Sequence, residues 1–124
     1  MPHAVIEGEV DLGAWARDLP DLLERRGPDV LRTGEVLVER GGRAVLVEAT
    51  AVEAGRRQTF YVRVSAHASR ATVRIDPLSR VERSEGVRAL VALVAADLLE
   101  RSAGAKLGAT NLVLPSRASG RTRA

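Results

Sequence analysis

The apolar segment at residues 87–99 limits the possible folds more than any other part of the chain. Apolar residues recur at helical spacing and also fill the positions between, at Leu90, Val91, Ala92, Leu93, Val94, Ala95, Ala96, Leu98 and Leu99. A surface helix needs an apolar stripe only about 100° wide, and a membrane span needs about 20 apolar residues. This segment therefore predicts a helix at the centre of a core, or one that also meets a second chain.

Alternating segments before this helix predict an antiparallel sheet. Residues 29–53 are typical of a hairpin around Gly41-Gly42, because two glycines accept the positive φ values of a primed turn. That turn pairs Val38 with Val45 and Val36 with Val47 on one face. Residues 58–68 and 71–76 alternate in the same way after a loop at residues 54–57, so a four-stranded meander with one apolar face is predicted.

The N-terminal part predicts one strand and one or two short helices. Residues 4–12 alternate as in a half-buried strand, and a helical stripe follows at Trp15, Leu19, Leu22 and Leu23. Pro20 interrupts this stripe, and Asp18 could cap a second short helix that Gly27-Pro28 would end. The order strand, helix or helices, four strands, helix predicts a two-layer α+β domain, with about five strands packed against a long C-terminal helix.

The flanks of the long helix also carry predictions. Asp76-Pro77 is expected to start the helical region, with Ser79 and Glu82 at capping-box spacing. The helix is expected to end near Gly104, and residues 111–114 could add a short strand.

Charge and length predict one domain with a basic tail. The 124 residues include 19 basic and 16 acidic ones. Three of the 19 lie in the tail, so 16 basic residues balance 16 acidic ones over residues 1–114. We expect residues 1–114 to form the domain and residues 115–124 to be disordered. Nucleic acid could be contacted weakly by the tail alone, through Arg117, Arg121 and Arg123.

Composition excludes several chemistries. The chain has no cysteine, two histidines and one residue each of Trp, Tyr and Phe, so thiolate chemistry, cysteine zinc sites and rows of stacking aromatics are excluded. No phosphate-binding glycine motif is present, and we expect no metal and no cofactor. Acidic residues stand where a secretory signal would be apolar, and no segment is long enough to span a membrane, so a cytoplasmic location is expected.

The outward positions of residues 58–68 form the most suggestive polar cluster, at Thr59, Tyr61, Arg63, Ser65 and His67. These side chains could supply an acid/base and an anion clamp, with His67 or Tyr61 as candidate catalytic groups. If Thr50 opposes Tyr61 and Glu48 opposes Arg63, a solvated sheet face with cross-strand charge pairs is the favoured explanation. The two interpretations differ in whether this face lines a cavity or meets water.

The element order resembles the helix-grip domains of the START and Bet v 1 type, through residues 6–12, residues 15–23, the meander through Ile75 and residues 87–99. It departs from them in having five clear strands where that superfamily has about seven. A hot-dog fold, with residues 15–26 as the central helix, and a cystatin-like fold are alternatives. The helix-grip resemblance implies an apolar ligand between sheet and last helix, near Val62, Val64, Val91, Val94 and Leu98.

These observations favour a non-enzymatic domain that binds a small apolar ligand or forms a homodimer through the same apolar surface. The alternative is an enzyme of hot-dog or helix-grip type, thioesterase-like or cyclase-like, that acts on a hydrophobic substrate.

Overall fold

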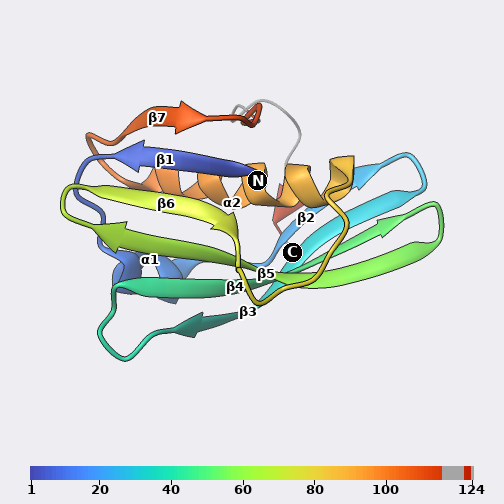
Figure 1. The fold of residues 1–124 in the computed structure, drawn as a ribbon, viewed down its shortest axis with the longest axis horizontal. Helices are drawn as coiled ribbons and strands as arrows, with labels where there is room; N and C mark the ends of the chain where they lie inside the picture. Colours follow the sequence, from blue (N-terminus) through green and yellow to red (C-terminus); the bar gives the residue numbers. More distant parts are fainter. Residues whose placement is uncertain (116–121, 124) are drawn as a thin grey trace.

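A computed structural model of the chain describes residues 1–115 and 122–123, which form one antiparallel sheet and two helices (Figure 1). The sheet has eight strands in the order β7-β1-β6-β5-β4-β3-β2-β8. The elements are β1 (His3–Glu7), α1 (Leu12–Asp18), β2 (Leu22–Arg26), β3 (Asp29–Val38), β4 (Ala44–Glu53), β5 (Arg56–His67), β6 (Arg70–Ile75), α2 (Glu85–Arg101), β7 (Lys106–Thr110) and β8 (Thr122–Arg123).

The long helix α2 crosses one face of the sheet, which we call the inner face, and runs behind the strands in Figure 1. It contacts β1, β3, β4, β5 and β6, and its residues 90–98 are all buried. Inward-facing side chains of these strands pack against it in one hydrophobic cluster. The α+β class and the central position of the long helix are therefore confirmed.

The four strands of the predicted meander are present as β3 to β6, and one predicted register is confirmed. Val38 opposes Val45 and Val36 opposes Val47. The predicted pairing of β4 with β5 is wrong by two residues, because Thr50 opposes Thr59. The connection is a two-residue turn at Ala54-Gly55, both with positive φ, and not a four-residue loop. A shift of two keeps every side chain on its predicted face.

The predicted second helix near Leu22 is wrong, and so is the strand count. Helix α1 ends at Asp18, and residues 22–26 form β2, which turns through Gly27-Pro28 into β3. Pro20 lies between α1 and β2, and the Leu22 amide donates to Thr33 Oγ1 of β3 at 2.8 Å. Pairing with β3 therefore determines the structure of residues 22–26, in preference to the short helical pattern of apolar residues. The observed order is strand, helix, five strands, helix and two strands.

The observed ends of several elements also differ from the predicted ones. β1 ends at Glu7, before Gly8 with its φ of 123°, and Asp11 caps α1 by accepting from the Ala14 amide. Residues 76–84 are not helical, and α2 begins at Glu85 with Ser84 as its N-cap. Ser79 accepts instead from the Tyr61 amide, which fixes this connection beside β5.

After α2, the extra strand is β7 at residues 106–110, which pairs with β1, and not residues 111–114. The helix that crosses the sheet is α2, whereas the hot-dog alternative placed a central helix at residues 15–26. Among the residues that the structure describes, no helix is long and apolar enough to cross a membrane.

Candidate functional site

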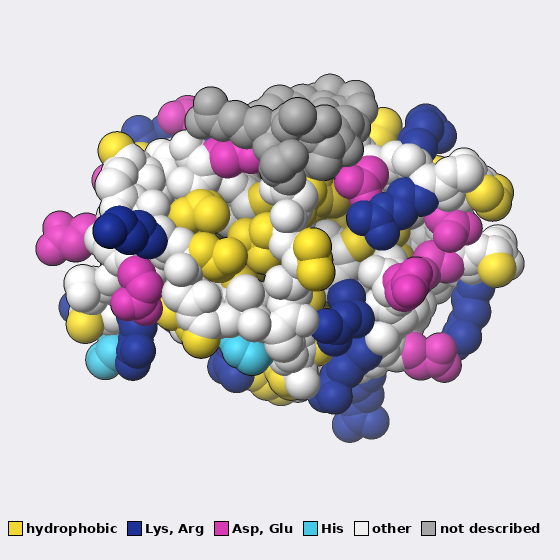
Figure 2. Space-filling model, turned by 90° about the horizontal axis from the view of Figure 1, so that it is seen from above, with side chains coloured by type: hydrophobic (Ala, Val, Ile, Leu, Met, Phe, Trp, Pro, Cys, Tyr) yellow, Lys and Arg dark blue, Asp and Glu magenta, His cyan; other side chains and the backbone are white. Residues whose placement is uncertain are grey.

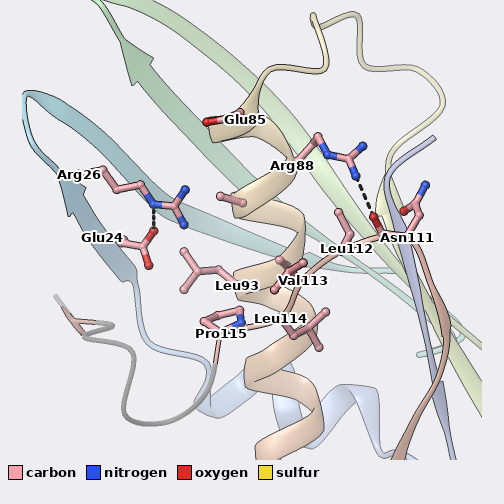
Figure 3. A pocket seen from close by; sticks show the side chains of 12 residues that line it. Glu24, Arg26, Glu85, Arg88, Leu93, Asn111, Leu112, Val113, Leu114 and Pro115 are labelled. Carbon is pink, nitrogen blue, oxygen red and sulfur yellow. Dashed lines mark hydrogen bonds and ion pairs between the residues drawn. The ribbon is translucent and has the colours of Figure 1, made fainter.

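A groove of about 430 Å³ lies along the side of α2 that faces away from the core (Figure 3). It is bounded by β2 on one side and by the chain after β7 on the other. We call it the α2 groove; its lining residues are Glu24, Arg26, Glu85, Arg88, Ala89, Ala92, Leu93, Asn111, Leu112, Val113, Leu114 and Pro115.

The middle of the α2 groove is apolar. Ala89, Ala92 and Leu93 of α2 line it at helical spacing, and Leu112 and Leu114 line it from the facing chain. Val113, between these two leucines, is 94% exposed. Figure 2, seen from the side on which β7 lies, shows several hydrophobic side chains gathered near the middle of this face, with charged side chains around them.

The charged groups of the α2 groove come from β2 and from the first turns of α2. Arg26 Nε lies 2.5 Å from Glu24 Oε2, so these two charges neutralise each other. Arg88 Nη2 donates to the main-chain oxygen of Asn111 at 2.8 Å (Figure 3). Among the described residues Arg88 has no carboxylate within ion-pair distance, so most of its five N–H donors remain available.

Hydrogen bonds fix the wall formed by residues 111 and 112 to the N-terminal strand. The Asn111 side chain accepts from the His3 amide at 2.9 Å and donates to the Met1 carbonyl at 2.8 Å. Thr110 Oγ1 donates to the His3 carbonyl and accepts from the Leu112 amide. This part of the wall is therefore positioned by β1 and does not depend on a ligand.

The N-terminus of α2 is positioned by Glu53 at the end of β4. Glu53 Oε1 accepts from Ser84 Oγ at 2.5 Å, and Glu53 Oε2 accepts from the Gly86 amide at 2.9 Å. A carboxylate satisfies the free amides at a helix start and complements the helix dipole there. A Cβ added at Gly86 would lie 2.5 Å from Glu53 Cδ, so a larger residue at this position would displace the carboxylate.

Two further sets of polar contacts join α1 to α2, and β5 to the segment that precedes α2. Trp15 Nε1 of α1 donates to Asp97 Oδ2 at 2.9 Å, and Arg101 Nε lies 3.1 Å from the same oxygen, although Asp97 is 0% exposed. Arg56 donates two 3.0 Å hydrogen bonds to Glu82. These bonds, and then the opposite charge, lower the pKa of Glu82 and raise the pKa of Arg56.

The five residues expected to contact an inner ligand all belong to the hydrophobic core. Each is 0% exposed and lies between the sheet and α2; they are Val62, Val64, Val91, Val94 and Leu98. The α2 groove is lined by other residues, on the opposite side of the helix.

The candidate catalytic residues Tyr61 and His67 lie on β5 and face away from α2, on what we call the outer face of the sheet. His67 is exposed and Tyr61 half-buried. Six positions along a strand correspond to about 20 Å, so the two side chains are too far apart to act on one small substrate.

Of the tail arginines, Arg117 and Arg121 lie outside the described residues, and for Arg123 only the backbone pairing of β8 with β2 is described. The predicted disorder of residues 116–121 and 124 likewise lies outside the described part. Within that part, no cluster of three His, Cys, Asp or Glu side chains could hold a metal ion.

The residues of the α2 groove were missed by sequence reasoning. Arg88 interrupts the apolar run of α2, which was the one available signal, but its partner segment at residues 111–115 is distant in the sequence. Glu24 and Arg26 belong to a segment that was expected to be helical.

Comparison of the chain with models of known families, with curated proteins and with solved structures finds no match. Function is therefore inferred from the fold and its side chains.

Proposed function

We propose that the protein is a non-catalytic binding domain whose ligand is a small amphipathic anion, such as a medium-chain carboxylate, held in the α2 groove. The observation that carries this proposal is the combination, in one 430 Å³ groove, of an apolar middle with an arginine that no described carboxylate neutralises. Small-molecule sites commonly have volumes of about 300–1,000 Å³ and combine apolar walls with a few polar groups.

The charge of the ligand is inferred from which charged side chains of the α2 groove already have a partner. Glu24 is compensated by Arg26, and Glu85 lies at the first position of α2, where the helix dipole favours a negative charge. Arg88 is held by one carbonyl of the wall and can offer a forked pair of donors to a carboxylate. The apolar chain of the ligand would then lie against Ala89, Val113 and Leu114, the apolar lining residues that keep exposed surface.

The α2 groove is a better ligand site than the space between sheet and helix that the helix-grip resemblance implies. An inner ligand would have to displace core side chains such as Val91 and Leu98, and opening a packed core costs several kcal/mol, on the order of 2–5 for one large side chain. A ligand in the groove would cover the exposed apolar surface of Ala89, Val113 and Leu114 without displacing the core.

The enzyme alternative has less support, because Tyr61 and His67 are far apart on the outer face of the sheet. A homodimer through α2 remains a second candidate, since a partner could also cover Val113 and the apolar lining of the groove. The two candidates differ in mass, because a carrier stays at 13.3 kDa in light scattering and a dimer has about twice that mass.

Binding of dansyl-labelled undecanoic acid, followed by fluorescence, tests the proposal. We expect a 1:1 complex with micromolar affinity, displaced by decanoate at least tenfold better than by decanol. Arg88→Gln should abolish this preference, and Ala89→Trp should block binding by filling the groove. Ala109→Trp, an exposed position on β7 outside the groove, is the matched control and should bind normally.

The proposal fails if the dye does not bind, or if Arg88→Gln and Ala89→Trp both bind as well as the parent. If the parent protein is a dimer in light scattering and Ala89→Trp is a monomer, the homodimer is established instead.

A further inference from the structure

A second, smaller hollow of about 160 Å³ lies on the sheet, across β3, β4 and β5 and away from the α2 groove. It is lined mainly by polar side chains: Arg32, Thr33, Gly34, Glu48, Thr50, Arg57 and Thr59. At about 30 Å³ per liquid water molecule, this is room for roughly five waters, or for one tetrahedral anion with a small substituent.

The strand register brings the donors of this hollow together. Arg32 opposes Thr50, and Thr50 opposes Thr59, so one row of outward side chains crosses three strands. Arg57 is two residues from Thr59 on β5 and therefore faces the same way. Thr50 is only 7% exposed, and its Oγ1 lies 3.2 Å from Thr59 Oγ1.

An irregularity in β3 makes the space for this hollow. The pairing with β4 shifts between Thr33 and Val36, as at a β-bulge, and Gly34 lies within the shift. A Cβ on Gly34 would lie 2.6 Å from Glu48 Oε1, so the missing side chain leaves room for the Glu48 carboxylate. Bulges and glycines inside strands commonly mark places where a ligand or another group approaches the backbone closely.

The charges of the hollow point to an oxyanion. Among the described residues, neither Arg32 nor Arg57 has a carboxylate within ion-pair distance. A guanidinium fork matches the oxygens of a phosphate, and hydroxyls such as those of Thr50 and Thr59 can donate to them. Glu48 is the one carboxylate that lines the hollow, and it would repel a bare dianion.

We propose that this hollow binds the phosphate group of a small phosphate monoester that also carries a hydroxyl. Arg32 and Arg57 would bind the phosphate oxygens. Because the Thr50 and Thr59 hydroxyls are hydrogen-bonded to each other, one of them would donate to the other and the second would donate to the phosphate. The hydroxyl of the ligand would donate to Glu48. The carboxylate then acts as a specificity group that favours hydroxylated esters over inorganic phosphate. This site does not depend on the function proposed for the α2 groove.

Glycerol 3-phosphate and inorganic phosphate, titrated separately at constant ionic strength and followed by amide chemical shifts, test the proposal. We expect shifts confined to β3, β4 and β5 around the hollow, and tighter binding of glycerol 3-phosphate. Arg32→Ala and Arg57→Ala should each weaken binding at least tenfold. Arg74→Ala, an arginine on the same face outside the hollow, should change it less than twofold.

Three conservative variants separate specific binding from general attraction. Thr50→Val should weaken binding severalfold, whereas Thr72→Val, on the outer face of β6, should not. Glu48→Gln should strengthen the binding of inorganic phosphate and reduce the advantage of glycerol 3-phosphate.

The proposal is overturned if Arg32→Ala and Arg57→Ala bind as the parent does, or if Arg74→Ala weakens binding equally. It is also overturned if chloride at equal ionic strength competes fully. Binding here should survive Arg88→Gln, so this test and that of the α2 groove fail independently.

Discussion

Whether a substitution of Gly86 stabilises or destabilises the fold depends on one contact. It occupies the second position of α2, and a Cβ there would lie 2.5 Å from Glu53 Cδ and 2.8 Å from both Glu53 carboxylate oxygens. Glycine to alanine in a helix normally stabilises by up to about 1 kcal/mol. In Gly86→Ala the Glu53 carboxylate has to move, which breaks its hydrogen bonds with Ser84 and with the amide of residue 86.

The magnitudes favour destabilisation. A hydrogen bond to a charged group contributes about 1.5–3 kcal/mol, and two such bonds are lost. Glu53 is half-buried, so water can replace part of this contribution, and the gain in helix propensity offsets another part. We therefore expect Gly86→Ala to lower the free energy of unfolding by about 1–3 kcal/mol.

Urea denaturation followed by circular dichroism measures this change. Gly13→Ala is the matched control, because Gly13 is also the second residue of its helix and its added Cβ would meet only Asp11 Oδ1, at 3.6 Å. Gly13→Ala should be neutral or stabilising. In a Glu53→Ala background Gly86→Ala should also become neutral or stabilising. Equal stabilisation by Gly13→Ala and Gly86→Ala in the parent would refute this reasoning.

Three further predictions concern stability. Leu98→Ala should cost about 2–5 kcal/mol in calorimetry because it leaves a cavity between sheet and helix, and a parent-like melting temperature would contradict the core described above. Asp97→Ala should cost about 3–5 kcal/mol, and a double-mutant cycle with Trp15→Phe should show coupling; additive effects would mean that the indole bond contributes nothing. The lowered pKa of Glu82 stabilises the fold above its ordinary pKa, and this contribution is lost as the pH falls through the folded pKa. In acid titrations monitored by circular dichroism, Glu82→Gln should therefore reduce the pH dependence below about pH 5, and an unchanged pH dependence would contradict this.

The sequence predicted those parts of the fold that rest on local periodicity. The alternation of residues 29–76 located β3 to β6, and the apolar segment located α2. Near Leu22 a helical stripe and a strand were both compatible with the residues, and pairing with β3 decided between them. Turn length cannot be read from periodicity, so the β4–β5 register was predicted two residues away from the observed one.

The α2 groove could not be predicted, because it joins elements that are distant in the sequence. Arg88 meets Asn111 across 23 positions, and Glu24 reaches the same groove only because β2 is a strand. Similarly, the hollow at Gly34 depends on an irregularity in β3 that the pattern of residues did not predict.

Amide chemical-shift mapping with decanoate tests the central claim most directly. If the ligand lies in the α2 groove, the largest shifts will fall on Ala89, Ala92, Leu93, Leu112 and Val113, and the shifts at Val62 and Val64 will be small. Largest shifts at Val62, Val64 and Val91 would place the ligand inside the core, and uniform or absent shifts would show that the groove holds no such ligand. Either result would contradict the account.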